Sequence, residues 1–486
     1  MDLSSMKHLE PERVFYYFDQ MTKIPRCSHK EEQIADYLEN FAKEHELKYI
    51  RDKVNNIIIT KKATKGYEDS PTLILQGHMD MVCEKKENCH IDFDQDPIPY
   101  VIEGDYILSH DTTLGADNGI AVAMALAILE SDQYDHPELE VLITVNEEDG
   151  MTGAKELDGS LLKGKILLNL DSEREGVACI SCAGGERDYI SFTRETAPIE
   201  GEREFYELSV TGLKGGHSGQ DISKGLGNSN KLLARALYRL MDQFKIELID
   251  IEGGAKPNAI PRYSKAKITI LPKDRKNIQD TIVELNGEFV GELGKVDPNV
   301  RLNFEKAKEE WKEALKEEIA KNIVYLLNIL PNGVQSMSHD IEGLVESSVN
   351  VGVIESHKDQ IRILTNSRSS SASLKEEIGD RHRICAELVG GEFVVQSAYP
   401  AWEYKDESPI REVAMESYRG LTGKELELEA IHAGLECGIF VETIGDIDML
   451  SIGPNISGPH APGENLQISS TKRVFDFVIE ILKNLK

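Results

Sequence analysis

A histidine and an aspartate, two residues apart, follow the short apolar run 73–75 and could serve a metal ion. Alternate residues of an extended segment point the same way, so a strand ending near Gly77 would present His78 and Asp80 together at its carboxyl end. A metal-bound imidazole usually donates its other N–H to a carboxylate, which fixes the tautomer and the orientation of the ring. The pair therefore fits a metal ligand, His78, that is oriented by Asp80. By itself, however, such a pair is more often an ordinary surface histidine beside an acid.

Other acidic residues follow or begin segments that the sequence predicts to be buried. They are Asp117 before the small apolar stretch 120–129, Glu147 and Glu148 after the strand that ends at residue 145, and Asp171 after the strand 165–170. Singly, Asp117 reads as a helix N-cap, and the acidic run 147–149 reads as an exposed turn. In open α/β sheets, however, ligands bind outside the carboxyl ends of the strands. Together with His78, these acids indicate one cation site at that edge of a sheet.

The chain returns to this pattern near its end. His460 lies in a loop rich in proline and glycine after the predicted strand 448–452. Between the two patterns, residues 188–402 combine alternating strands with charged helices and differ in character from both flanks. The sequence therefore predicts an α/β domain in two parts, 1–187 and 403–486, with a separate α+β domain of usual size inserted between them.

Three residues of the inserted segment could bind a small substrate. His217 lies in a glycine-rich run, Asn258 lies between two prolines, and Arg368 could hold a carboxylate through two parallel hydrogen bonds. Each also has a plainer interpretation: an exposed histidine in a flexible turn, a polar turn residue, and a surface arginine. For each residue taken alone, the plainer interpretation is favoured.

The composition is typical of a globular protein and excludes some partners. The formal net charge of −30 opposes binding to nucleic acids and to anionic membranes, since both need a basic face. No apolar run approaches the roughly 20 residues of a membrane span, and the first residues lack the apolar core of a secretion signal. Seven cysteines, an odd number spread along 486 residues, argue against a disulfide framework. We therefore expect a cytoplasmic protein.

Taken in order, the candidate site residues resemble those of a known family. The chain is similar, across nearly its whole length, to the M20 family of co-catalytic di-zinc peptidases in the order and spacing of His78, Asp80, Asp117, Glu147, Glu148, Asp171 and His460. Four longer strings resemble a cytosolic branch of that family, the aminoacyl-histidine dipeptidases. They are D-T-T-L-G-A-D-N-G-I, S-C-A-G-G-E, H-A-G-L-E-C-G and S-G-P-H-A-P-G-E. The resemblance implies a di-metal catalytic domain of the aminopeptidase type, with a mixed central sheet flanked by helices and an inserted α+β lid domain.

The resemblance also implies a role for each residue. Two divalent metal ions would be held by His78, Asp117, Glu148, Asp171 and His460, with Asp117 bridging both ions. Asp80 would orient His78, and Glu147 would be the general base. The lid would bind a small peptide substrate through His217, Asn258 and Arg368. Zinc is the ion expected for mixed histidine and carboxylate ligands with an open position, although manganese and cobalt tolerate similar ligands.

The reaction that the resemblance implies is hydrolysis of unblocked dipeptides, including Xaa-His dipeptides such as carnosine-type substrates. The same residues would serve an N-acyl amino acid deacylase or a tripeptidase, and a non-catalytic metal- or peptide-binding relative is the alternative from another class. A dipeptidase must also bind a free amino group, for which Glu436 and Asp149 are candidates. A homodimer is compatible with this interpretation, although the long insertion argues against a simple pairing of lid against lid.

Overall fold

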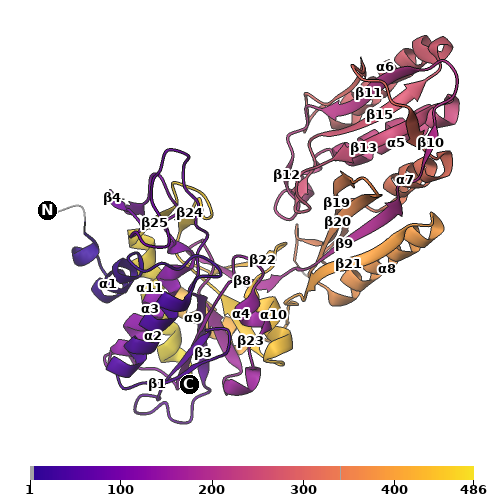
Figure 1. The fold of residues 1–486 in the computed structure, drawn as a ribbon. Helices are drawn as coiled ribbons and strands as arrows, with labels where there is room; N and C mark the ends of the chain where they lie inside the picture. The colour runs from indigo at the N-terminus through magenta and orange to yellow at the C-terminus, as the bar shows by residue number, and fades with distance from the viewer. Residues whose placement is uncertain (1–4, 340) are drawn as a thin grey trace. The chain divides into compact units, whose positions relative to one another are not determined.

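The computed structural model describes residues 5–339 and 341–486, which form two compact units (Figure 1). The first unit comprises Met1–Ser181, Tyr404–Ala430 and Leu435–Lys486. The second comprises Cys182–Glu403 together with the short segment Ile431–Gly434. The chain therefore leaves the first unit, forms most of the second and then returns. The domain boundaries expected after residues 187 and 402 stay a prediction.

A mixed sheet of eight strands forms the centre of the first unit. In spatial order its strands are β1 (Lys48–Arg51), β2 (Ile57–Lys61), β6 (Leu139–Thr144), β3 (Leu73–His78), β7 (Ile166–Asn169), β23 (Asp448–Ser451), β8 (Val177–Cys182) and β22 (Glu427–Ile431). Strand β3 runs parallel to β6 and β7, and β7 runs parallel to β23, so the carboxyl ends of these strands lie at one edge. Every residue of β3 and β6 is buried, which explains why their sequences are apolar runs without alternation.

Helices pack on this sheet. The first unit contains α1 (Glu12–Met21), α2 (Glu32–Glu44), α3 (Ala116–Glu130), α4 (Thr152–Lys155), α9 (Pro409–Thr422), α10 (Glu436–Thr443), α11 (Ile468–Asn484) and the short 3-10 helices η1 (Met6–His8) and η2 (Gly159–Leu161). Nearly every residue of α3 is buried, because its alanine, valine, isoleucine and leucine side chains cover all its faces and it packs against both α1 and β3. The mixed α/β class predicted from the sequence is confirmed.

A small sheet of four strands connects distant parts of the first unit (Figure 1). Its strands, in spatial order, are β24 (Ile456–Ser457), β25 (Asn465–Gln467), β5 (Tyr106–Leu108) and β4 (Val101–Glu103). Because β25 pairs with β5, the loop between β24 and β25 is tied to the segment that leads into α3. That loop carries His460.

The second unit is built on a separate sheet of nine strands. Its strands are, in spatial order, β16 (Arg301–Lys306), β11 (Glu204–Thr211), β15 (Ser264–Ile270), β13 (Glu247–Gly253), β19 (Val345–Ser356), β20 (Gln360–Ser369), β9 (Gly184–Thr193) and β21 (Glu392–Tyr399), with β18 (Gly333–Met337) pairing to β19. Two further pairs join β10 (Thr196–Pro198) to β17 (Glu313–Leu315) and β12 (Gly216–His217) to β14 (Ala259–Ile260). Its helices are α5 (Ser229–Gln243), α6 (Arg275–Leu293), α7 (Glu317–Ile329), α8 (Ala372–Leu388), η3 (Ile222–Lys224) and η4 (Pro272–Asp274).

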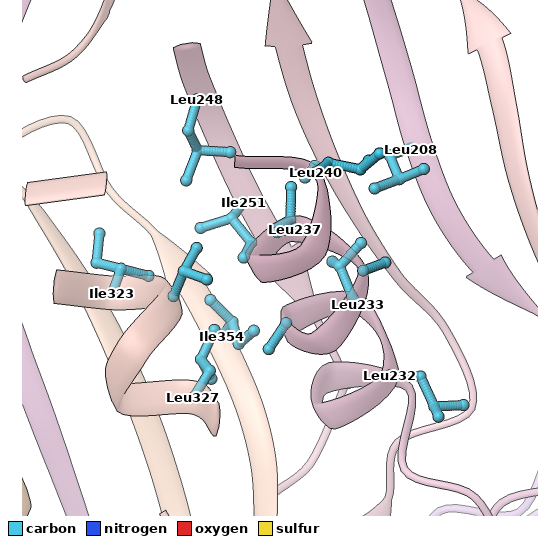
Figure 2. Close-up of a cluster of buried hydrophobic side chains, with 14 of the residues drawn as sticks. Leu208, Leu232, Leu233, Leu237, Leu240, Leu248, Ile251, Ile323, Leu327 and Ile354 are labelled. Carbon is cyan, nitrogen blue, oxygen red and sulfur yellow. The ribbon is translucent and has the colours of Figure 1, made fainter. Parts of the chain in front are cut away.

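The second unit has a hydrophobic core of its own. Figure 2 shows Leu233 and Leu237 of α5 beside Ile251 of β13, with Ile323 and Leu327 of α7 close by, and all five belong to one buried cluster. Each such side chain contributes about 1.5–3 kcal/mol when it is fully buried. The inserted segment therefore carries enough buried apolar surface to hold its elements together.

One disulfide joins Cys27 to Cys83 in the first unit. The cysteine count argued against a framework of disulfides and did not predict this bond, because a separation of 56 residues leaves no local spacing pattern. Cys179 and Cys182 are buried in β8. Within the part of the chain that the structure describes, no helix is both long and apolar enough to cross a membrane.

Candidate metal centre

The strand order places the predicted ligands at one edge of the central sheet. His78 is the last residue of β3, and its neighbour in the register is Thr144 at the end of the parallel strand β6. Glu147 and Glu148 follow β6, and Asp171 follows the parallel strand β7 in the same way. The remaining two predicted ligands reach this edge from the start of α3 and from the loop between β24 and β25: Asp117 and His460.

Asp117 lies at the centre of the cluster, and each of its carboxylate oxygens faces a different histidine. Its Oδ1 is 3.2 Å from His78 Nε2, and its Oδ2 is 3.1 Å from His460 Nε2. Asp171 Oδ1 lies 3.5 Å from the same nitrogen of His78, and Glu148 Oε2 lies 2.8 Å from the same nitrogen of His460. The cluster thus has two halves, His78 with Asp171 and His460 with Glu148, joined by Asp117.

The electrostatics of the cluster favour positive charge. Hydrogen bonds with Asp117 and Glu148 raise the pKa of His460 to about 11. Burial opposes protonation of His78, but Asp171 and Asp117 raise the pKa of that imidazole well above its usual value. Burial, together with repulsion from the neighbouring carboxylates, raises the pKa of Asp171 to about 7. Carboxylates that stabilise positive charge this strongly would also stabilise a divalent cation.

The donor atoms fit metal ions. Ligand atoms of His78, Asp117 and Glu148 all lie within 4.8 Å of one another. The other oxygen of Glu148, Oε1, is buried and has no hydrogen-bond partner. Two imidazoles and three carboxylates are a ligand set that zinc accepts. Since each half of the cluster combines a histidine, its own carboxylate and one oxygen of Asp117, the residues fit two cations as well as one.

Asp80 is fully buried behind His78 and contacts several groups of the site. Its Oδ1 lies 3.3 Å from His78 Nδ1 and accepts the Glu147 N–H at 3.0 Å. Its Oδ2 accepts the Ser28 hydroxyl at 2.8 Å and the Glu148 N–H at 3.3 Å. Burial alone would raise the pKa of Asp80, but the hydrogen bond with His78 lowers it and keeps the group ionised. One carboxylate thus contacts the imidazole of His78 and the backbone that carries both glutamates.

Glu147 differs from its neighbour Glu148. Burial, with repulsion from Asp171 and Glu148, raises the pKa of Glu147 well above the usual value of a glutamate. A carboxylate with a raised pKa is suited to accept and release a proton near neutral pH. His460 contacts Glu148, at 2.8 Å, so the two adjacent glutamates have different surroundings.

Two buried side chains that support this edge were missed by sequence reasoning. The guanidinium of Arg26 donates hydrogen bonds to the backbone carbonyls of Met79, Asp80 and Gly115. The carboxylate of Glu464 accepts the backbone N–H groups of residues 114–117. Both act on backbone atoms far away in the sequence, so neither has a spacing that distinguishes it. Glu464 does end the string S-G-P-H-A-P-G-E, which was the one available signal.

The two acids considered for a substrate amino group differ in their surroundings. Glu436 is fully buried at the start of α10, where its Oε2 accepts hydrogen bonds from Gln76 Nε2 at 2.6 Å and Thr144 Oγ1 at 2.8 Å. Burial raises the pKa of Glu436 to about 8. It therefore links β3 to β6. Asp149 is exposed and pairs with His29 at 2.9 Å.

The second unit brings Arg368 and His217 close to a second histidine, His432. Arg368 is buried on β20, and its guanidinium donates to the hydroxyl of Tyr399 at 3.1 Å. Burial and the positive charge of Arg368 lower the pKa of His217. The same two causes lower the pKa of His432 to about 3, and His432 Nε2 lies 2.7 Å from Ser348 Oγ. These residues form a cluster, called here the arginine cluster, that holds a buried cation beside neutral imidazoles.

Asn258 contacts the backbone beside His217 of the arginine cluster. Its backbone carbonyl accepts the N–H of Ser218, the residue after His217, at 2.9 Å. His217 also pairs with Ala259 in the β12–β14 ladder. His432 and Tyr399 were not identified from the sequence. The segment that holds His432 reads as the end of a strand of the first domain, although it belongs to the second unit.

Comparison with known proteins shows which family the chain is similar to. The profile of peptidase family M20/M25/M40 matches residues 74–484. A cytosol non-specific dipeptidase of Escherichia coli (strain K12) is 39% identical over 490 residues, covering 99% of this chain and 99% of that protein. The crystal structure of an aminoacylhistidine dipeptidase from Vibrio alginolyticus matches with a TM-score of 0.93 and 36% identity, covering 99% of this chain and 98% of the other.

More distant structures share the fold alone. An aminopeptidase from Bacillus cereus matches with a TM-score of 0.55 and 16% identity, over 98% of this chain and 99% of its own. The family profile covers most of the chain, and the curated relative is similar along its whole length. The chain therefore belongs to peptidase family M20/M25/M40.

Proposed function

We propose that this protein is a metal-dependent dipeptidase that hydrolyses unblocked dipeptides, including those that end in histidine. The observation that carries the proposal is Asp117, whose two carboxylate oxygens each face a separate histidine. Similarity along the full chain to a cytosol non-specific dipeptidase and to an aminoacylhistidine dipeptidase supports the substrate class. The same similarity supports a cytoplasmic location. A homodimer stays a prediction.

The proposed centre holds two divalent cations. His78 and Asp171 would hold one, His460 and Glu148 the other, and Asp117 would bridge them. Zinc suits this mixture of imidazole and carboxylate ligands, and manganese or cobalt would also be accepted. Cations bound there would polarise a peptide carbonyl and lower the pKa of water.

The side chains around the centre would carry the proton transfers. Glu147 would take the proton from the attacking water and then give it to the leaving amine, the task for which its raised pKa suits it. Asp80 would keep the imidazole of His78 in one tautomer and orientation through its contact with Nδ1.

The arginine cluster would bind the substrate. Arg368 would hold the free C-terminal carboxylate of the dipeptide, since a guanidinium pairs with a carboxylate through two parallel hydrogen bonds. His217, kept neutral by burial and by Arg368, would donate a hydrogen bond to the carbonyl oxygen as it gains negative charge. Asn258 would contact the peptide beside His217. A requirement for a free carboxylate close to the scissile bond would restrict the substrates to short peptides.

The decisive experiment restores metal-stripped protein with Zn²⁺, Mn²⁺ or Co²⁺ and supplies a small panel of substrates. The panel contains β-Ala-His, Gly-His, Ala-Leu, a tripeptide and an N-acetyl amino acid. We expect metal-dependent cleavage of the dipeptides, including both that end in histidine. Cleavage of the acetylated compound alone would make the protein a deacylase, and cleavage of the tripeptide alone would make it a tripeptidase. No cleavage with any metal would favour a non-catalytic binding protein.

A further inference from the structure

One buried carboxylate accepts hydrogen bonds from four consecutive backbone N–H groups. Glu464 Oε2 accepts from Leu114 at 2.6 Å and from Gly115 at 2.9 Å, and its Oε1 accepts from Ala116 at 2.8 Å and from Asp117 at 3.2 Å. The side chain is 2% exposed. Hydrogen bonds to an ionised carboxylate are stronger than neutral ones, and their strength rises where water is excluded.

The segment that receives this carboxylate leads into α3. The first N–H groups of a helix have no partner within the helix and usually bind a capping side chain nearby. Here the residue before the helix is Gly115, at a φ of 72°, which supplies no side-chain cap. Glu464 supplies the acceptors instead, from 347 to 350 residues further along the chain. The backbone of Asp117 is therefore held by a residue outside its own segment.

Glu464 is also tied to His460 through its own backbone. Its N–H donates to the carbonyl of Ala461 at 3.2 Å, and the Ala461 N–H donates to the carbonyl of Gly458 at 3.3 Å. Residues 458–464 are therefore folded into two successive hydrogen-bonded turns, called here the His460 turn. The Glu464 carbonyl accepts the N–H of Ser109 at 3.2 Å, which anchors this turn to the segment before α3. One residue thus contacts the backbone of Asp117 with its side chain and stabilises the turn that presents His460.

Arg26 holds the same segment from the other direction. Its guanidinium donates hydrogen bonds to the carbonyl of Gly115 and to the carbonyls of Met79 and Asp80 beside His78. The N–H of the same Gly115 donates to Glu464. Both residues therefore hold Gly115. Only Glu464 also belongs to the His460 turn, and only Arg26 also holds the backbone beside His78.

We propose that Glu464 is a positioning residue that fixes Asp117 relative to His460 and so sets the affinity of the cation held by His460, Glu148 and Asp117. The inference rests on the proposed function, because it presupposes two bound cations. Removing the charge of Glu464 should selectively weaken the binding of that cation, while the cation held by His78 and Asp171 stays bound. Losing a residue that orients metal ligands costs roughly 10–100-fold in metal affinity.

The test is calorimetric titration of Zn²⁺ into metal-stripped protein, comparing the wild type with Glu464→Gln and Glu140→Gln. In Glu464→Gln, one of the two oxygens becomes an NH₂ group that faces N–H donors. Glu140 is a matched control, since it is also 2% exposed and accepts the backbone N–H groups of Lys163 and Gly164, near the start of β6, away from the metal edge. We expect two tight ions in the wild type and in Glu140→Gln. In Glu464→Gln we expect one ion to bind tightly and the affinity for the other to fall roughly 10–100-fold.

A folded Glu464→Gln variant that binds both ions with wild-type affinity would overturn the inference, and so would an equal loss in Glu140→Gln. If Glu464→Gln does not fold, Glu464→Asp keeps the charge but is one methylene shorter, and the same selective loss is expected there. The proposed function is tested separately by the wild type. Two bound ions without dipeptide cleavage would reject the dipeptidase and leave the role of Glu464 intact.

Discussion

His460 in the first unit and His432 in the second are the same residue type in opposite surroundings. Hydrogen bonds with Asp117 and Glu148 raise the pKa of His460 to about 11, whereas burial and Arg368 lower that of His432 to about 3. Crowded carboxylates make the first cluster a place for cations. A buried guanidinium with neutral imidazoles makes the second a place for an anion. The division matches the two kinds of charge in the proposed reaction, which are the positive metal ions and the negative substrate carboxylate.

The comparison also separates side chains that hold ligands from side chains that do chemistry. At the first cluster, Glu147 is proposed to transfer a proton and not to bind a metal, although Glu148 beside it is a proposed ligand. Replacing Glu147 with Ala should lower kcat by roughly 10²–10⁴-fold, the usual contribution of a general base. The number of bound Zn²⁺ ions should stay unchanged, and both quantities can be measured on the same preparation by steady-state kinetics and metal analysis.

A control for this variant is Asp149→Asn, which alters the exposed acid two residues further on. Its activity should remain close to that of the wild type. Near-normal turnover by Glu147→Ala would show that another group accepts the proton, and loss of metal from that variant would make Glu147 a ligand.

The two units differ in covalent support as well. The Cys27–Cys83 disulfide lies in the first unit, and Arg26 and Ser28 on either side of Cys27 both contact Asp80. A disulfide of this kind typically contributes about 2–4 kcal/mol by limiting the unfolded chain. The variant Cys27→Ser/Cys83→Ser should lose that amount in the free energy of unfolding, measured in urea without reductant. Cys89→Ser is the control and should change little, and an unaltered double variant would indicate that the two cysteines are reduced in solution.

Sequence reasoning reached the cation cluster because its residues follow a general rule. His78 ends one buried parallel strand, Glu148 and Asp171 follow two others, and the ends of parallel strands meet at one edge. The supports of the cluster were not predictable in this way. Glu464 and Arg26 act on backbone groups that only the folded chain brings near, and the sequence carries no pattern for such contacts.

The arginine cluster was only half predicted for a related reason. His217 and Arg368 lie inside the inserted segment, and they were identified by residue type. His432 lies in Ile431–Gly434, four residues that belong to the second unit although sequence on both sides belongs to the first. A pattern read along the chain assigns such a short excursion to its flanks. Its place is fixed by contacts such as the one between His432 and Ser348.

The anion site proposed for the arginine cluster can be tested through the substrate. Arg368→Ala should raise KM roughly 10–100-fold, because a hydrogen bond to a charged group contributes about 1.5–3 kcal/mol. With the wild type, amidation of the dipeptide's C-terminus should raise KM by the same factor. With Arg368→Ala, amidation should raise KM little further. Arg362→Ala is the matched control, since Arg362 lies on the same strand and stacks on Tyr189. Equal effects on the free and amidated dipeptides would place the carboxylate elsewhere.

The most direct test of the comparison is the pH dependence of stability. In metal-free protein, the pKa of folded His460 is raised to about 11, above the value of about 6.5 for unfolded chains. Its contribution is therefore complete below pH about 6.5 and declines as the pH rises towards about 11. For His432 the folded pKa is lowered to about 3, so the contribution is complete above pH about 6.5 and declines as the pH falls towards 3.

The variants His460→Gln and His432→Gln should reveal these opposite slopes. We expect the difference in free energy of unfolding between wild type and His460→Gln to shrink from pH about 7 to about 9, and that for His432→Gln to shrink from about 6.5 to about 4.5. The measurement is urea unfolding of chelator-treated protein across this range. Zinc added to the same samples should abolish the slope for His460 alone, because a bound cation replaces the proton there. Two slopes of the same sign would mean that the clusters do not differ in charge as their neighbours indicate.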